Sequence, residues 1–250
     1  MVFENRILPR VSCSDDEMCI DEFCRYNDIQ IIGKSISSLN QTDIELCQHL
    51  VCEYMRYNDF LAYLSSASRR KERIYLKYIL TPPYTTSKMD CEHVLNLLLS
   101  LHVVSDYSFS TNSHSYFIEM EPENSLTIRT VLSIGLCSIL VSNSIGLQSV
   151  RYNTRITLSG QEDKADVVVL QGKKLWLINI ENAIGLEADV PSHSKQLERV
   201  KKRIYRSRKT YCSIEDVAIV TPHVASLLPS SPNIVAIDKI NSLAALLTSM

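Results

Sequence analysis

The chain has 250 residues, of which 45% are hydrophobic and 22% charged, and its formal net charge at pH 7 is −2. This composition is typical of a folded protein with one large or two small domains, and it excludes a disordered or uniformly basic chain. Any contact with nucleic acid must therefore come from a local basic patch. The charged N-terminus lacks a secretory leader and eight cysteines are scattered, so we expect an intracellular protein, cytoplasmic or nuclear, with reduced thiols.

Residues 1–40 are expected to form an irregular N-terminal segment with a short strand at residues 29–32. Thr42 is a candidate N-cap, because Glu45 three residues later completes a capping box, and the apolar spacing continues a helix to about residue 65. A basic amphipathic helix is then predicted from Arg69 to Leu80, and the two prolines that follow end it.

A third helix is predicted to begin at Ser87 and to run to about residue 103. Aromatic and apolar residues then alternate with polar ones, at 107 and 109 and again at 116 and 118, which predicts a β-hairpin. Helices followed by a two-stranded hairpin are typical of a winged helix, so residues 41–120 are interpreted as a helical, winged-helix-like domain. Lys88 is the only Lys or Arg between 88 and 120, which favours packing or dimerisation over DNA reading.

Residues 121–250 are expected to form the second domain, an α/β unit with a mixed sheet. Its most apolar stretch, residues 126–150, contains Arg129 and several serines, which favours a helix packed inside the domain over a membrane span. The predicted order after that helix (126–141) is three strands (148–158, 166–170, 174–181), a helix (193–208), a strand (216–220), a short helix (222–228), a strand (233–237) and a last helix (239–249).

The most informative motif is the pair of strands joined by the Gln171-Gly172-Lys173-Lys174 turn. Asp166 opens the first strand, and the second ends in Asn179-Ile180-Glu181. Because side chains alternate along a strand, Asn179 and Glu181 should share a face and lie near Asp166 at the open end of the hairpin. Oxygen ligands of this kind bind Mg²⁺ or Mn²⁺, and such a metal polarises a phosphate and activates water.

An aspartate, two apolar strands and a polar ending resemble the core of the PD-(D/E)xK nuclease superfamily. Residues 121–250 are similar to the C-terminal nuclease module of CRISPR-associated, cyclic-oligoadenylate-activated effectors, which also place a winged-helix-like segment before the nuclease. The resemblance implies a restriction-endonuclease-like fold in which Asp166 matches the metal-binding aspartate. Asn179 falls where a second acid is expected and Glu181 where the lysine is expected. Lys195, on the next predicted helix, is a candidate migrated lysine.

These departures predict altered chemistry, because a glutamate in the lysine position brings negative charge to the place where a phosphodiester approaches. A second signal is the basic run from Lys195 to Lys209, in which eight of fifteen residues are Lys or Arg. Such a helix face binds phosphates without regard to sequence. The expected nucleic-acid-binding residues are Arg199, Lys201, Lys202, Arg203, Arg206, Arg208 and Lys209.

The leading functional hypothesis is a nuclease-fold protein with a degenerate active site, kept as a nucleic-acid-binding or assembly subunit. The first alternative is an active endonuclease that uses Mg²⁺ or Mn²⁺, with Asp166 and Glu181 as metal ligands and Lys195 as the substitute lysine. The second alternative is a protein-binding scaffold, with a protein partner or a homodimer. Whether the chain is an enzyme stays open at this point, and neither DNA nor RNA is preferred.

Overall fold

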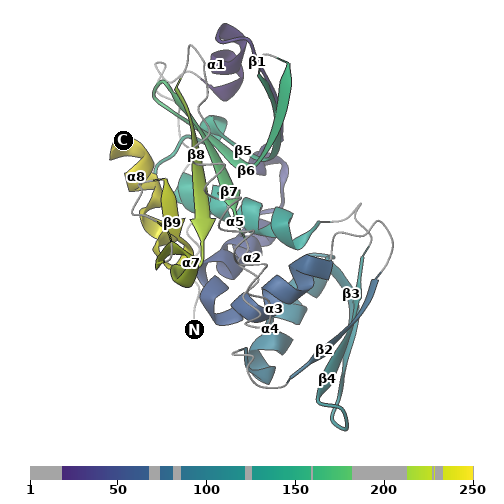
Figure 1. Ribbon diagram of the computed structural model, residues 1–250. Helices are drawn as coiled ribbons and strands as arrows, with labels where there is room; N and C mark the ends of the chain where they lie inside the picture. The colour runs from purple at the N-terminus through teal and green to yellow at the C-terminus, as the bar shows by residue number, and fades with distance from the viewer. Residues whose placement is uncertain are drawn as a thin grey trace.

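The computed structural model describes residues 19–67, 74–80, 86–121, 126–158, 160–181, 213–226, 228 and 233–249. Its centre is a six-stranded mixed sheet with the order β1-β5-β6-β7-β8-β9 (Figure 1). The strands comprise β1 (Ile29–Lys34), β5 (Val150–Leu158), β6 (Gln161–Gln171), β7 (Lys174–Ile180), β8 (Ser213–Val220) and β9 (Ile234–Ala236). The neighbours from β1 to β7 are antiparallel and those from β7 to β9 are parallel. The predicted α/β class is confirmed.

The two faces of the sheet bury different helices, as strand alternation requires. On β6, Val167 and Val169 join the larger core, which also holds α5 (Ile128–Ser142), whereas Val168 and Leu170 face α1 (Ile20–Tyr26) and β1. Helix α5 is apolar on every side and its residues from Val131 to Leu140 are buried. The most apolar stretch is therefore an internal helix, as predicted, and no helix in the described residues is long and apolar enough to cross a membrane.

The segment before residue 41 is not irregular throughout, which corrects our expectation for residues 1–40. Ile29 and Ile31 pair with Leu158 and Ile156, so β1 forms the edge of the large sheet beside β5. Helix α1 packs on that edge through Ile20 and Phe23. The strand predicted at residues 29–32 is confirmed, but its place in the sheet of the C-terminal half was not foreseen. The proposed domain boundaries at 40 and 120 stay a prediction.

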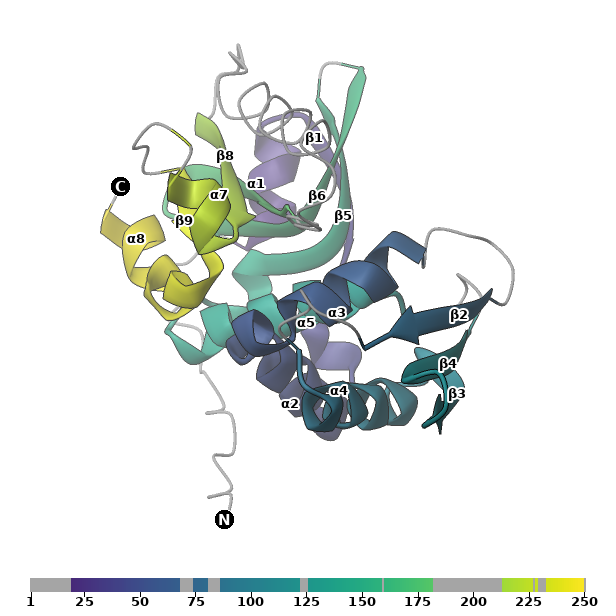
Figure 2. The same cartoon turned by 60° about the horizontal axis from the view of Figure 1, so that its bottom comes forward.

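A helical layer, α2 (Gln41–Cys52), α3 (Tyr54–Ala67) and α4 (Lys88–Ser100), lies between the large sheet and a second, three-stranded sheet (Figure 2). That sheet has the order β2-β4-β3, with β2 (Ile74–Ile79), β3 (Val104–Ser110) and β4 (Ser115–Met120). The hairpin β3–β4 and the start of α4 after its N-cap Ser87 are confirmed. Helix α2 packs on α5 so closely that Gly135 faces the Cys47 carbonyl.

Two local predictions in this layer were wrong. The predicted helix from Arg69 to Leu80 is strand β2 over its described part, because Ile74 and Tyr78 are buried while Tyr75 and Lys77 are exposed, the alternation of a strand. The cap of α2 is Asn40, whose side chain accepts a hydrogen bond from the Thr42 N–H; Thr42 is not the cap. Both residue types cap helices well, so composition alone did not separate them.

The C-terminal part follows the predicted order with small changes. The short helix after β8 is α7 (Pro222–Ser226), and the last predicted helix divides into a 3-10 segment (Ile237–Ser242) and α8 (Leu243–Ser249). Leu243 and Leu247 pack into the same core as Trp176 of β7. The helix predicted at residues 193–208 lies outside the described residues.

Candidate functional site

The candidate site begins at Asp166, which lies inside β6 near the end of β7. The register pairs Val167 with Ile178, and the next backbone donor of β7, the Ile180 N–H, bonds Asp166 Oδ2 at 2.7 Å. The Arg129 guanidinium binds the same carboxylate through both oxygens, with Nε on Oδ1 and Nη2 2.8 Å from Oδ2. Three donors thus hold a carboxylate whose side chain is only 8% exposed.

Arg129 lies in the first turn of α5, which places its guanidinium beside this carboxylate. Thr127 caps the helix by accepting a hydrogen bond from the Thr130 N–H, and Ser133 bonds the Arg129 carbonyl. Burial lowers the pKa of the guanidinium, but the hydrogen bond to Asp166 and the charges of Asp166 and Glu181 outweigh it, and the pKa is raised. Arg129 therefore carries a permanent positive charge at the site.

Asp166 binds a cation through both carboxylate oxygens, and this cation is the guanidinium of Arg129. Both Asp166 oxygens accept hydrogen bonds from Arg129, and Oδ2 also accepts one from the Ile180 N–H, so a guanidinium already neutralises this carboxylate. In the part of the chain that the structure describes, no group of three or more His, Cys, Asp or Glu side chains is placed to hold a metal. The positive charge of Arg129 opposes the approach of a divalent cation to Asp166.

The structure brings Asp166 and Asn179 together, as predicted, because both line one cleft. Asn179 is 2% exposed, and the opposite face of β7 carries Trp176, Ile178 and Ile180 in the core. Glu181 is just past β7, where its N–H bonds the Ile219 carbonyl at 2.8 Å. Its side chain contributes to the raised pKa of Arg129, but it is not among the residues that line the cleft.

The cleft has a volume of about 650 Å³ and opens beside the β1–β5–β6 edge of the large sheet. Its charged lining residues are three cations, Arg129, Arg155 and Lys164, and one carboxylate, Asp166. Arg155 also bonds Glu162, 2.7 Å away, in an exposed pair. The other lining residues are mostly polar: Ile32, Thr127, Thr130, Ser133, Asn153, Thr154, Ala165 and Asn179. A polar cleft with excess positive charge attracts anions.

Backbone irregularities shape the rim of this cleft. The pairing of β1 with β5 shifts register between Ile32 and Lys34, around Gly33, and Asn153 in β5 has φ of 48°. A Cβ on Gly33 would lie 2.6 Å from Thr154 Oγ1, so glycine allows the two strands to approach. Thr154 Oγ1 is buried and has no hydrogen-bond partner among the described residues, although buried polar atoms are normally paired.

The residues predicted for the basic helix lie outside the described residues, so their roles stay predictions. They are Lys195 and the seven expected nucleic-acid contacts Arg199, Lys201, Lys202, Arg203, Arg206, Arg208 and Lys209. Arg129, Arg155 and Lys164 were not among the site residues predicted from the sequence. One signal for Arg129 was available, because it is the only charged residue between 126 and 150.

Comparison with known proteins was informative only at the level of structure. No family model matches the chain, and no curated protein matches its sequence. The fold is similar to the crystal structure of protein VC1899 from Vibrio cholerae, with a TM-score of 0.51, 14% identity, and coverage of 94% of this chain and 61% of that one. A second similar structure is Can2 from Sulfobacillus thermosulfidooxidans in complex with cyclic tetra-adenylate, with a TM-score of 0.48 and the same identity and coverage.

The likeness to VC1899 supports the fold over almost the whole length of this chain. It extends from the helical layer through the large sheet, because 94% of the chain is covered. The chain spans only 61% of the length of either structure. At 14% identity a shared fold does not carry shared activity.

Proposed function

We propose that this protein is a nuclease-fold subunit that binds nucleic acid in the Arg129–Asp166 cleft without cutting it. The single observation that carries the proposal is the Arg129–Asp166 pair. In an active PD-(D/E)xK site the aspartate holds a metal, and here a guanidinium takes both of its oxygens. The assignment of residues 121–250 to that superfamily, with Asn179 and Glu181 as changed motif positions, is part of this proposal.

The charge of the cleft supports binding of a phosphate backbone. Arg129 is half-exposed beside Asp166, and Arg155 and Lys164 are exposed on the neighbouring strands β5 and β6. Among the lining residues these three positive charges face one carboxylate, Asp166, while Glu162 pairs with Arg155 beside the cleft. The unpaired Thr154 Oγ1 is a hydrogen-bonding group of the same cleft that a bound ligand would satisfy.

The loss of cutting follows from the same contacts. Catalysis by this class of site needs a metal to activate water and to offset charge on the phosphate. The Arg129 guanidinium already binds both oxygens of Asp166, Asn179 is neutral, and Glu181 adds negative charge next to Arg129. The helical layer and the β2–β4–β3 sheet, which we interpret as winged-helix-like, would serve as the assembly or accessory part of this subunit.

The test compares binding and cleavage in one set of samples. Labelled single- and double-stranded DNA and RNA are incubated with the protein in Mn²⁺ or in EDTA, and affinity is measured by fluorescence anisotropy over a salt series. We expect binding without cutting, and an affinity about tenfold or more lower when Arg155 and Lys164 are both changed to Glu. The matched control changes Lys173 and Lys239 to Glu, which removes the same charge away from the cleft and should leave affinity unchanged.

Two results would overturn the proposal. Metal-dependent cleavage that Asp166→Ala abolishes would show an active nuclease instead. Absence of binding to every probe at physiological salt would favour a protein-binding scaffold.

A further inference from the structure

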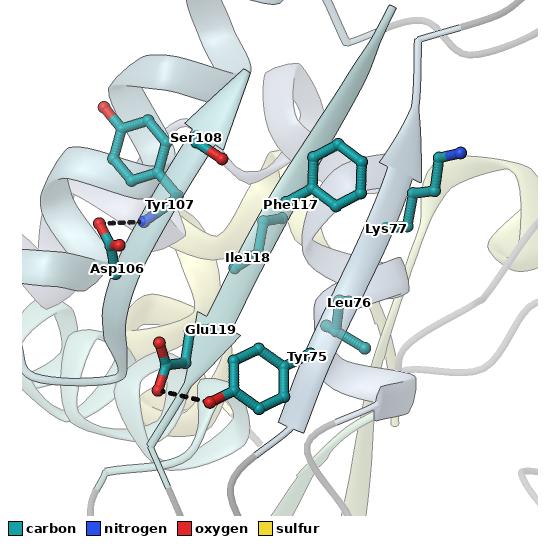
Figure 3. A pocket seen from close by; sticks show the side chains of 9 residues that line it. All are labelled: Tyr75, Leu76, Lys77, Asp106, Tyr107, Ser108, Phe117, Ile118 and Glu119. Atoms are coloured by element: carbon teal, nitrogen blue, oxygen red, sulfur yellow. Dashed lines mark hydrogen bonds between the residues drawn. The ribbon is translucent and has the colours of Figure 1, made fainter. Parts of the chain in front are cut away.

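The three-stranded sheet has one face in the core and one face open to solvent. Inward residues of its central strand, Tyr116 and Ile118, are buried against α4 and α3. On the outward face the register sets Tyr75 of β2 opposite Glu119 of β4, and Lys77 opposite Phe117. Figure 3 shows this face, from which the Tyr75 and Phe117 rings project.

Both rings are available to a ligand. Tyr75 is 75% exposed and Phe117 46% exposed, although large aromatic side chains are usually well buried. Because they occupy diagonal positions on adjacent antiparallel strands, their Cα atoms are about 7–8 Å apart. Two open rings at this separation form a platform for two neighbouring planar groups. A hollow of about 260 Å³ lies across the same face.

Polar groups surround the rings in a definite arrangement. Lys77 Nζ lies 5.7 Å from the centre of the Phe117 ring. Tyr75 Oη donates a hydrogen bond to Glu119 Oε1 at 3.3 Å, and Asp106 is opposite Glu119 on the other side. The face therefore presents a cation beside one ring and carboxylates beside the other.

This composition favours nucleic acid over a protein partner. Lys, Asp, Glu and Ser are depleted at the centres of protein interfaces, whereas here Lys77, Asp106, Ser108 and Glu119 adjoin the rings. Unpaired bases stack on aromatic rings, a lysine contacts phosphate, and carboxylates accept hydrogen bonds from base amino groups. In a duplex the base faces are already stacked on one another, so only a single strand offers them.

We propose that the outer face of the β2–β4–β3 sheet binds single-stranded nucleic acid, with unpaired bases stacked on Tyr75 and Phe117. The inference rests on the proposed function and adds to it a preference for single strands. In Figure 1 the small sheet and the β1–β5–β6 edge, where the cleft opens, lie on opposite sides of α5 and the helical layer.

The first test measures the affinity of Tyr75→Ala, Phe117→Ala and the double variant for a labelled single-stranded 12-mer and its duplex. Each loss of a ring should weaken single-strand binding roughly 5- to 100-fold, because stacking on one ring is worth that much, and should leave duplex binding unchanged. Tyr26→Ala is the matched control, since Tyr26 is an aromatic residue of α1 that is 79% exposed. Phe117→Tyr keeps the ring and should keep the affinity.

The second test reads stacking directly. The only tryptophan of the chain, Trp176, is buried, so Phe117→Trp would introduce an exposed indole on the platform. Its fluorescence should be quenched by the single strand and not by the duplex. An unchanged single-strand affinity in the Tyr75/Phe117 double variant, or no quenching, would overturn the inference.

The outcomes separate this inference from the proposed function. If the Arg155/Lys164 variant loses affinity and the ring variants do not, the cleft proposal stands and the platform fails. If the wild-type protein binds neither probe, both fail.

Discussion

Arg129 and Asp166 are joined through both carboxylate oxygens, although 37 positions separate them in the sequence. The pair links the first turn of α5 to β6, and so ties the buried helix to the edge of the cleft. A guanidinium and a carboxylate fit each other in this two-pronged geometry, which a lysine does not reproduce. The pair therefore has both a structural role and a role in the charge of the site.

Removal of the guanidinium should destabilise the fold. Arg129→Gln leaves a buried carboxylate with the Ile180 N–H as the only remaining donor of the three. We expect a loss of about 1–3 kcal/mol in the free energy of unfolding, the usual penalty for an unsatisfied buried acceptor. Urea unfolding at pH 7 measures it. Arg155→Gln, which breaks an exposed pair with Glu162, should cost less than about 1 kcal/mol. Equal losses in the two variants would contradict a special role for Arg129.

A metal site should become available only when the guanidinium is removed. Arg129→Ala frees the oxygens of Asp166, and Asn179→Asp adds a second carboxylate to the same cleft. We expect the double variant to bind Mn²⁺ about tenfold or more tightly than the wild-type protein, as measured by titration calorimetry. Asn179→Asp alone retains Arg129 and should show no gain. A gain in that single variant would mean that Arg129 does not block the site.

Gly135 should be intolerant of any side chain. A Cβ at this position would lie 2.2 Å from the Cys47 carbonyl oxygen and 2.7 Å from Val51 Cγ2, and the first of these is backbone. Gly135→Ala must separate α5 from α2, so we expect a loss of about 3 kcal/mol or more in unfolding free energy. Ser142→Ala, at the end of the same helix, should change it by less than about 0.5 kcal/mol. Thermal unfolding of both variants tests the helix contact.

The pair His49 and His93 should make stability depend on pH. Their Nε2 atoms are 3.2 Å apart. Burial and the charges of His93 and Arg56 lower the pKa of His49, and the charge of Glu53, which raises it, opposes them only in part. The unfolded chain then binds more protons than the folded one below about pH 6.5, so stability is lost as pH falls through that value.

The check is urea unfolding at about pH 7.5 and about pH 5.5. The wild-type protein should be less stable at the lower pH, and His49→Gln should reduce that difference. His114→Asn, which removes an exposed imidazole from the β3–β4 turn, is the control. If the pH dependence of stability is the same in His49→Gln as in the wild-type protein, the prediction is wrong.

The core of the site was predictable because its signals are local. Asp166 and Asn179 flank a short turn between two apolar runs, and antiparallel pairing through that turn brings them together. Arg129 was not predictable, because its contact with Asp166 depends on how α5 packs against the sheet. Lys164 and Arg155 were missed because they border the site only through the pairing of β5 with β6.

The errors in the fold have a similar origin. From Ile74 to Leu80 nearly every residue is apolar or aromatic, so the helical and strand periods both fit. The segment forms a strand because it pairs with β4, and this contact cannot be seen in the local sequence. The strand at residues 29–32 was predicted from its own composition, but its neighbour β5 begins more than a hundred residues later.

The pairing of β1 with β5 has a consequence for the order of folding. Residues that form β1 leave the ribosome early, but their partner strand is made only after the whole helical layer. Helices α3 and α4 and the small sheet contact one another within residues 54–120 and can form first, since contacts between near neighbours close short loops. Until β5 is made, the backbone N–H and C=O groups of β1 have no partner strand. An unpaired strand edge of this kind can pair with other chains. Synthesis that stalls before β5 should therefore yield an aggregation-prone chain with a folded middle.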